Sequence, residues 1–287
     1  MIKNMSTWSL NPFLHSTIPA EVVQTMLADP QLVWRLALVS MLLGIAYPLV
    51  HKLLSRYSKV YKSLGSVSSN KQVVILHHAV EALALTLLTP ILSYYMLHLY
   101  FQNHNIHEIT YYLRKVSVIM TSVVFMYMIE LASRFKDPRK IIVFHHLITT
   151  LDGVLAYALA TETMLKTASV LVYFICFEAF TFIGLVLYRL FPDSNVTPKA
   201  IIIGMVCFGV SRPFELLGVG AIVVGSWNDE HFVKWQGILQ LVVTLIVFSL
   251  QVLTLRIHYQ VWIRCVARQA ECDIGKTLNS EKTEETV

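Results

Sequence analysis

Charged residues are scarce in this 287-residue chain, since only 14% of its positions are Asp, Glu, Lys or Arg. A typical soluble domain has about 25%. Apolar residues make up 55% of the chain. So few charged side chains cannot cover a water-soluble fold of this size, because most of its surface would be apolar. The composition therefore excludes a soluble globular domain and a mostly disordered chain.

Cysteine is also scarce, with four residues and no pair at the spacing of a metal site. Four cysteines in a chain of this length do not form the dense framework of a disulfide scaffold. The net charge is +5, but the basic residues lie between apolar runs. That distribution is typical of membrane topology and excludes a soluble nucleic-acid-binding protein.

Long apolar runs are what the sequence does have. A transmembrane helix needs about 20 mainly apolar residues, and continuous runs favour helices over barrel strands, whose residues alternate. The predicted fold is all-α, a polytopic transmembrane helix bundle of about seven spans. The spans are expected near residues 32–53, 73–100, 116–132, 141–160, 168–190, 200–225 and 237–262.

Lys and Arg concentrate in alternate loops, which predicts a lumenal N-terminus and a cytosolic C-terminus by the positive-inside rule. Residues 1–30 have no compact apolar core and are expected to form a lumenal segment without a cleavable signal. Residues 31–69 are predicted to form the first span and a basic cytosolic loop. The main transmembrane domain is expected over residues 70–265, and residues 266–287 are predicted to be a disordered cytosolic tail.

Ionisable residues inside the apolar runs are the best indicators of function, because they are costly in lipid unless they face a cavity or a partner. The predicted cytosolic half holds His77, His78, Glu81, Glu130, His145 and His146. Nearer the midplane are Asp152, Glu178, Arg212 and Glu215. The other half is nearly free of charge. This distribution predicts one polar cavity that opens to the cytosol.

Two of the runs carry imidazoles at similar depth. His77 and His78 lie about one helical turn before Glu81, and His145 shares a helical stripe with Asp152. Imidazole can act as a general base, a proton shuttle or a metal ligand near neutral pH. The predicted catalytic residues are His145, His146 and Asp152. The predicted substrate-binding residues are His77, His78, Glu81, Thr149, Glu178 and Arg212.

Some of these polar residues also have a purely structural interpretation. Glu130 lies one turn before Arg134, so an ion pair on the helix explains it better than catalysis does. Arg212 could neutralise Glu215 on its own helix, or it could pair with Glu178 across a helix interface. Both pairings would satisfy a charge inside the bundle.

The stretch from Tyr127 to Thr150 carries a resemblance to a known family. It has an aromatic-rich helix, a basic turn with Lys136-Asp137, and then His145-His146 followed by Thr149. This pattern resembles the TLC-domain family of multi-span endoplasmic reticulum proteins. The family includes the ceramide synthases and the translocation-associated membrane proteins.

Two further stretches extend the resemblance over about residues 70–265. Val73–Glu81 looks like the family's first His-bearing helix, and Ser211–Phe214 is similar to an Arg-containing helix of its non-synthase branches. Ceramide synthases carry a His-Asp pair where this chain has Val172-Tyr173, and the nearest acid here is Glu178. The resemblance thus implies a role in acyl-lipid metabolism or lipid homeostasis at the endoplasmic reticulum, but it does not imply N-acyltransferase activity.

The resemblance implies a membrane lipid as ligand, the predicted cytosolic opening would suit an acyl-CoA as donor, and a homo-oligomer stays open. If the protein is an enzyme, it would transfer or hydrolyse an acyl group, and no cofactor, metal or nucleic acid is expected. A metal-dependent intramembrane hydrolase and a seven-helix receptor are alternatives, although a retinal protein would need a lysine that the last run lacks. A transporter is a further alternative, because Pro90 and Pro213 are predicted to interrupt two spans, but no repeated halves are visible.

Overall fold

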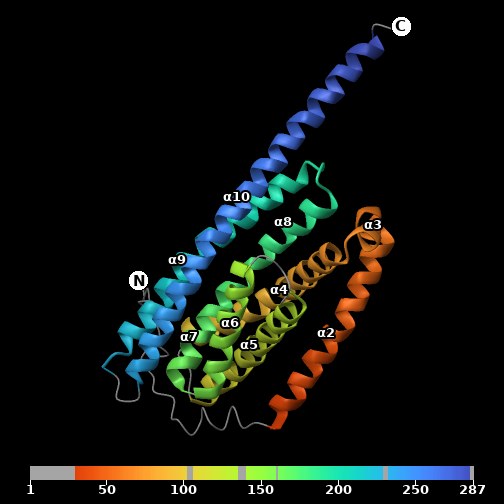
Figure 1. Cartoon of the computed structure of the whole chain (residues 1–287). Coiled ribbons are helices and arrows are strands. Elements are labelled where there is room, and N and C mark those ends of the chain that lie inside the picture. The colour runs from red at the N-terminus through yellow and green to blue at the C-terminus, as the bar shows by residue number, and fades with distance from the viewer. Residues whose placement is uncertain (1–29, 102–105, 135–139, 160, 229–231, 285–287) are drawn as a thin grey trace, which may run out of the picture. The chain divides into compact units, whose positions relative to one another are not determined.

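The computed structural model describes residues 30–101, 106–134, 140–159, 161–228 and 232–284 (Figure 1). Within these ranges the regular elements are all α-helices, which confirms the predicted all-α class. The helices are α2 (Pro30–Tyr57), α3 (Lys59–Val67), α4 (Ser69–Phe101), α5 (Ile106–Arg134), α6 (Lys140–Leu159), α7 (Glu162–Ile175), α8 (Glu178–Leu190), α9 (Val196–Gly225) and α10 (Lys234–Glu284). The predicted lumenal segment 1–30 lies almost wholly outside the described residues.

In the described part of the chain, six helical segments are long and apolar enough to cross a bilayer. They are Ala37–Tyr57, Asn70–Tyr100, His107–Ser133, Thr163–Leu190, Val196–Gly225 and Lys234–Glu271. A shorter apolar helix, Val143–Ala156, occupies the predicted fourth span. The chain is therefore a multi-span helical membrane protein, whereas the orientation of its termini stays a prediction.

The surface of α10 shows how the chain suits a lipid environment. Apolar side chains such as Ile238 and Val242 are exposed, while the polar side chains of Gln240, Thr244 and Gln251 are buried. A helix of a water-soluble protein shows the reverse pattern. Lipid favours this arrangement because it solvates apolar side chains, whereas polar groups in a bilayer need partners inside the protein.

The chain divides into two compact units, each built from separate stretches of sequence. The first unit comprises Met1–Gly44, Leu87–Cys176 and Pro213–Ser249. The second unit comprises Ile45–Thr86, Phe177–Arg212 and Leu250–Val287. Several helices contribute a part to each unit, so each unit is treated by itself below.

The first unit is organised by α5, α6 and α7, which pack against one another. Its apolar core includes Leu99, Ile109, Leu113 and Leu165. A glycine sets the approach of α6 to α5, because a Cβ at Gly153 would collide with the side chain of Val124. The same two helices carry Glu130 and His146.

The second unit has its closest packing between α8 and α9. A Cβ at Gly204 would lie 2.8 Å from the carbonyl oxygen of Phe180, so only glycine fits there without displacement of the backbone. The hydroxyl of Thr181 donates to the carbonyl oxygen of Gly204 over 3.2 Å. Small residues at such crossings are typical of membrane helices, because they let the backbones come close.

The structure corrects two expectations about helix interruptions. Pro90 and Pro213 lie inside α4 and α9, which continue through them, so the prediction that they interrupt spans is wrong. Membrane helices tolerate proline because neighbouring helices, Ser and Thr side chains and local adjustments of the helix satisfy the freed backbone groups. The predicted fifth span is instead divided into α7 and α8 by a turn at Cys176 and Phe177, and the hydroxyl of Thr89 donates to the Cys176 carbonyl oxygen.

The C-terminal part of the chain also differs from its expected form. α10 runs from Lys234 to Glu284, and it therefore continues through most of residues 266–287, where the sequence predicts a disordered tail. Repeated residues with good helix propensity, among them Ala267, Gln269 and Ala270, explain how the helix extends beyond the apolar run.

Candidate functional site

A buried carboxylate and a buried imidazole meet in the first unit. Glu130 lies near the end of α5 and His146 near the beginning of α6, and these two helices pack against each other. His146 Nε2 lies 3.1 Å from Glu130 Oε2. Glu130 has no exposed surface, His146 is buried, and the ring of Tyr127 lies 4.9 Å from the imidazole ring. Sequence reasoning assigned Glu130 to Arg134 and missed this contact.

The contact between Glu130 and His146 determines what the imidazole can do. When Nε2 carries the hydrogen and donates it to the carboxylate, the lone pair lies on Nδ1. The buried Nδ1 atom of His146 has no hydrogen-bond partner among the described residues. A carboxylate that fixes the tautomer of an imidazole whose other nitrogen is available is the arrangement of a general base.

His145 lies beside this pair but differs from it in setting. Its ring centroid is 5.3 Å from that of His146, and the side chain is only partly buried. The hydroxyl of Thr149 donates to the backbone carbonyl of His145 over 3.0 Å, which is a bond within α6. The predicted catalytic role of His145 and the predicted binding role of Thr149 stay predictions.

Asp152, the third predicted catalytic residue, has a buried amide as its partner. Gln240 Nε2 donates to Asp152 Oδ1 over 2.7 Å, and both side chains are buried. Asp152 lies six residues after His146, which is about 9 Å along the helix axis. The bond ties α6 to α10 in the first unit, and a role for Asp152 in catalysis stays a prediction.

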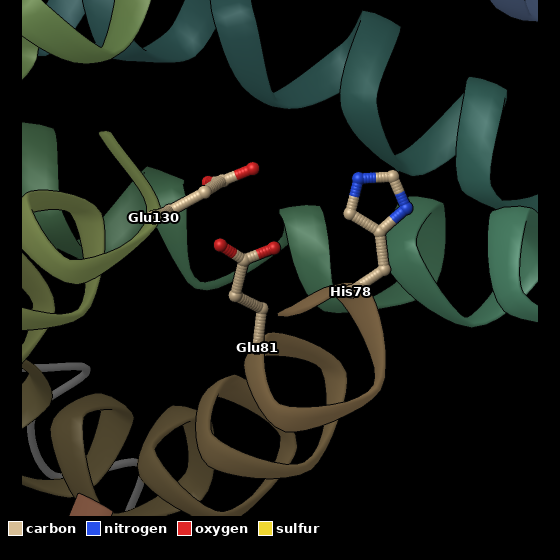
Figure 2. Close-up of side chains that lie close together, drawn as sticks. All are labelled: His78, Glu81 and Glu130. Atoms are coloured by element: carbon tan, nitrogen blue, oxygen red, sulfur yellow. The ribbon is translucent and has the colours of Figure 1, made fainter. Parts of the chain in front are cut away.

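The predicted binding residues on α4 belong to the second unit. His77 is buried, and its Nδ1 lies 2.7 Å from the hydroxyl of Tyr47 on α2. The guanidinium of Arg189 on α8 donates to His78 Nδ1 over 2.7 Å. Figure 2 shows His78 and Glu81 projecting from the same side of α4, and Glu81 has no exposed surface. Glu130, also labelled in Figure 2, belongs to the first unit and is described with its own partner above.

The second unit also holds an ion pair between α8 and α9. Arg212 Nη2 lies 2.5 Å from Glu178 Oε1, and both side chains are buried. Glu178 is in the first turn of α8, where the helix dipole favours an acid. The guanidinium of Arg212 also lies over the ring of Phe208, 4.6 Å from its centroid. Of the two pairings that the sequence left open for Arg212, the interhelical one is confirmed.

Several polar residues of the site were not found from the sequence. Arg189 was counted only as a topology signal, and Tyr47 was given no role. Gln240, Gln251 and His258 on α10 are buried, although they lie within a long apolar run. Their spacing of 11 and 7 residues keeps them on one helix face, so their periodicity could have revealed them.

The geometry defines an integral membrane protein of several helices whose buried polar groups form specific pairs in each unit. The chain matches no family model, and no curated protein or solved structure matches it.

Proposed function

We propose that this protein is a TLC-type enzyme of the endoplasmic reticulum membrane that transfers an acyl group to a membrane lipid. The observation that carries the proposal is the buried contact between His146 and Glu130. An imidazole oriented by a carboxylate is suited to remove a proton from a hydroxyl or an amine. The resemblance of the Tyr127–Thr150 stretch to the TLC family supports an acyl lipid as the substrate.

The acyl donor in this proposal is an acyl-CoA, and the acceptor is a lipid hydroxyl or amine. His146 Nδ1 takes the proton of the acceptor as its oxygen or nitrogen attacks the thioester carbonyl carbon. The new C–O or C–N bond forms, the C–S bond breaks, and the proton passes from His146 to the leaving thiolate. Glu130 stabilises the imidazolium that exists between the two proton transfers.

The setting of the pair supports this role further. Glu130, His146 and Tyr127 are all buried within a unit whose helices present apolar side chains to lipid. Burial keeps competing water away from a reactive acyl group. The positive-inside pattern favours a cytosolic opening, and acyl-CoA would enter from that side. A homo-oligomer is compatible with this proposal.

Comparative lipidomics of cells that express single histidine variants tests the proposal. The wild-type chain should raise one class of acyl lipid. His146→Gln should reduce that increase about 100-fold, because a general base contributes at least that factor. His145→Gln is the matched control, since the neighbouring imidazole lies outside the described contact with Glu130, and it should keep most of the activity.

Expression level and thermal midpoint in detergent must be matched among the three proteins. If His146→Gln changes the lipids as the wild type does, the pair is structural and the proposed function fails. The same conclusion follows if the wild type changes no lipid class under conditions in which purified protein is folded. Conversion of acyl-CoA and lipid by the purified wild type alone would complete the support.

A further inference from the structure

The hydroxyl of Thr150 differs from that of other threonines in the helices of this chain. A helical threonine can satisfy its hydroxyl by donating to the carbonyl oxygen of the residue four positions earlier. This bond is present for Thr121, Thr149, Thr167, Thr244 and Thr254. Thr150 is 7% exposed, and its Oγ1 has no hydrogen-bond partner among the described residues. Because no water in a bilayer replaces a missing partner, this buried hydroxyl indicates a polar ligand.

A second unpartnered atom belongs to the residue one turn earlier on the same helix. His146 Nδ1, the atom proposed above as the base, is buried and also lacks a hydrogen-bond partner in the part of the chain that the structure describes. Residues four apart on a helix are neighbours, separated by about 6 Å along the axis. Since both atoms lack a partner, they do not bond to each other. One oxygen atom between them can bond to both, because two hydrogen bonds of about 2.8 Å span such a gap.

The helix face that carries these two residues is turned toward α5 in the first unit. The imidazole of His146 lies against Glu130 of α5, and a Cβ at Gly153 would collide with Val124 of the same helix. Thr150 lies between these two contacts, four residues after the imidazole and three before the glycine. Thr150 therefore belongs to the same face of α6 as the proposed base.

We propose that Thr150 binds the acyl acceptor beside His146 and that this acceptor is a lipid hydroxyl rather than an amine. The inference rests on the proposed acyl transfer and names its acceptor. The acceptor hydroxyl donates its hydrogen to His146 Nδ1 and accepts from the hydroxyl of Thr150. Its remaining lone pair attacks the thioester carbonyl carbon of the acyl-CoA. The C–O bond forms, the C–S bond breaks, and the proton passes through His146 to the thiolate, so the products are an ester and free CoA.

The direction of the bond from Thr150 decides between the two kinds of acceptor. The Thr150 hydroxyl has no acceptor for its own hydrogen among the described residues, so it donates that hydrogen to the ligand. A hydroxyl oxygen has two lone pairs and keeps one for the attack. A neutral amine has a single lone pair, and a bond from Thr150 would occupy it. The arrangement therefore favours an ester as the product over an amide.

Two acceptors of equal chain length, oleyl alcohol and oleylamine, test this inference. The purified full-length protein in detergent micelles receives palmitoyl-CoA and one of them, and the ester or amide is quantified by mass spectrometry. The wild type should use the alcohol with a kcat/KM at least tenfold above that of the amine, whose concentration is corrected for its neutral fraction. An equal or higher kcat/KM for the amine would overturn the assignment to a hydroxyl. This comparison needs no variant, so it decides even if a Thr150 variant does not fold.

Variants of Thr150 test its contact with the acceptor. Thr150→Val removes the hydroxyl at nearly constant volume and should lower kcat/KM for oleyl alcohol about tenfold, because one hydrogen bond is lost. Thr150→Ser retains the hydroxyl and should stay within threefold of the wild type. Thr167→Val is the matched control, since Thr167 is buried in the same unit and its hydroxyl donates to the backbone of its own helix. It should stay within twofold of the wild type.

A thermal midpoint within about 3 °C of the wild type shows that each variant is folded. A folded Thr150→Val variant with the kcat/KM of the wild type would overturn the binding role of Thr150, and so would an equal loss in Thr150→Ser. If His146→Gln still abolishes the ester in that case, the proposed function stands while this inference fails. The absence of both products with the folded wild type would count against acyl transfer itself, and this inference would fall with it.

Discussion

The two units of this chain satisfy their buried polar groups in different ways. In the first unit, the carboxylates of Glu130 and Asp152 lie against neutral or exchangeable groups, an imidazole and an amide. In the second unit, arginine is the partner of a carboxylate at Glu178 and of an imidazole at His78. A guanidinium is always charged, whereas an imidazole changes its protonation near neutral pH.

This difference bears on the proposed proton transfer. The carboxylate of Glu130, 3.1 Å from Nε2 of His146, favours the hydrogen on Nε2 and the lone pair on Nδ1, as the proposed base requires. An arginine that donates to Nδ1 of His78 occupies the lone pair of that imidazole and places its hydrogen on Nε2. The charge of the partner thus decides whether an imidazole is bound through its hydrogen or through its lone pair.

The largest effect is expected when the permanently charged pair of the second unit is broken. Arg212→Met leaves the buried Glu178 carboxylate without its guanidinium and should lower the free energy of unfolding by about 3–5 kcal/mol. The double variant Glu178→Met with Arg212→Met removes both charges and should recover most of that loss. Thermal and denaturant unfolding in detergent micelles measure both effects.

The exposed Arg256 provides the control for this pair, and Arg256→Met should change stability by less than about 0.5 kcal/mol. A loss of under about 1 kcal/mol in Arg212→Met would show that the arginine is not the dominant partner of Glu178. The contrast between the units would then fail at its strongest point.

A smaller effect is expected for the neutral partner in the first unit. Gln240→Leu removes the amide that donates to Asp152 and should destabilise the chain by about 1–3 kcal/mol, since a buried acceptor loses its bond. Thr244→Val is the control, because the Thr244 hydroxyl bonds only to the backbone of its own helix in the described contacts, and it should change little. A cost as large as that of Arg212→Met would remove the difference between the units.

Asp152 also has a bearing on the predicted catalytic set. If the role of Asp152 is only to accept the hydrogen bond from Gln240, the Asp152→Asn variant should retain acyl transfer and change only in stability. Loss of activity in a folded Asp152→Asn variant would restore the role that the sequence predicts for it, and lipidomics beside the His146→Gln variant would measure it.

The length of the apolar runs was enough to predict the all-α membrane fold, because only helices and closed barrels can span a bilayer. The spacing of charges also indicated Glu178 as one partner for Arg212. The contact between Glu130 and His146 could not be predicted, since it depends on how α5 and α6 are rotated about their axes. Gly153 helps to fix that packing through a contact with a residue 29 positions away.

The division of one predicted span into α7 and α8 had no local signal either. No proline or glycine lies at Cys176 or Phe177, whereas Pro90 and Pro213, which are predicted to interrupt spans, lie inside continuous helices. In lipid, the satisfaction of backbone groups by neighbouring helices outweighs local propensity, as the bond from Thr89 to Cys176 illustrates. Local sequence rules derived from water-soluble helices are therefore least reliable at such breaks.

The smallest effect is expected where the second unit uses a neutral pair, the phenol of Tyr61 and the imidazole of His51, which lie 2.9 Å apart. Tyr61→Phe should cost about 1 kcal/mol near pH 8, because one hydrogen bond is lost. Burial raises the pKa of Tyr61 from 10 to about 12. The unfolded chain therefore releases the phenol proton at lower pH than the folded chain, and the contribution of Tyr61 to stability is present below pH 10 and lost as pH rises toward 12.

Thermal midpoints of wild type and Tyr61→Phe, measured from pH 8 to pH 12, test this prediction. The advantage of the wild type should shrink above pH 10, because only the wild type has this phenol to ionise. Tyr57→Phe is the matched control, since Tyr57 is 73% exposed and its removal should leave the pH profile unchanged. Parallel profiles for wild type and Tyr61→Phe would mean that the folded and unfolded chains ionise Tyr61 alike. The contrast between the units would then rest on their charged pairs alone, because the neutral pair of Tyr61 and His51 would respond to pH like an exposed side chain.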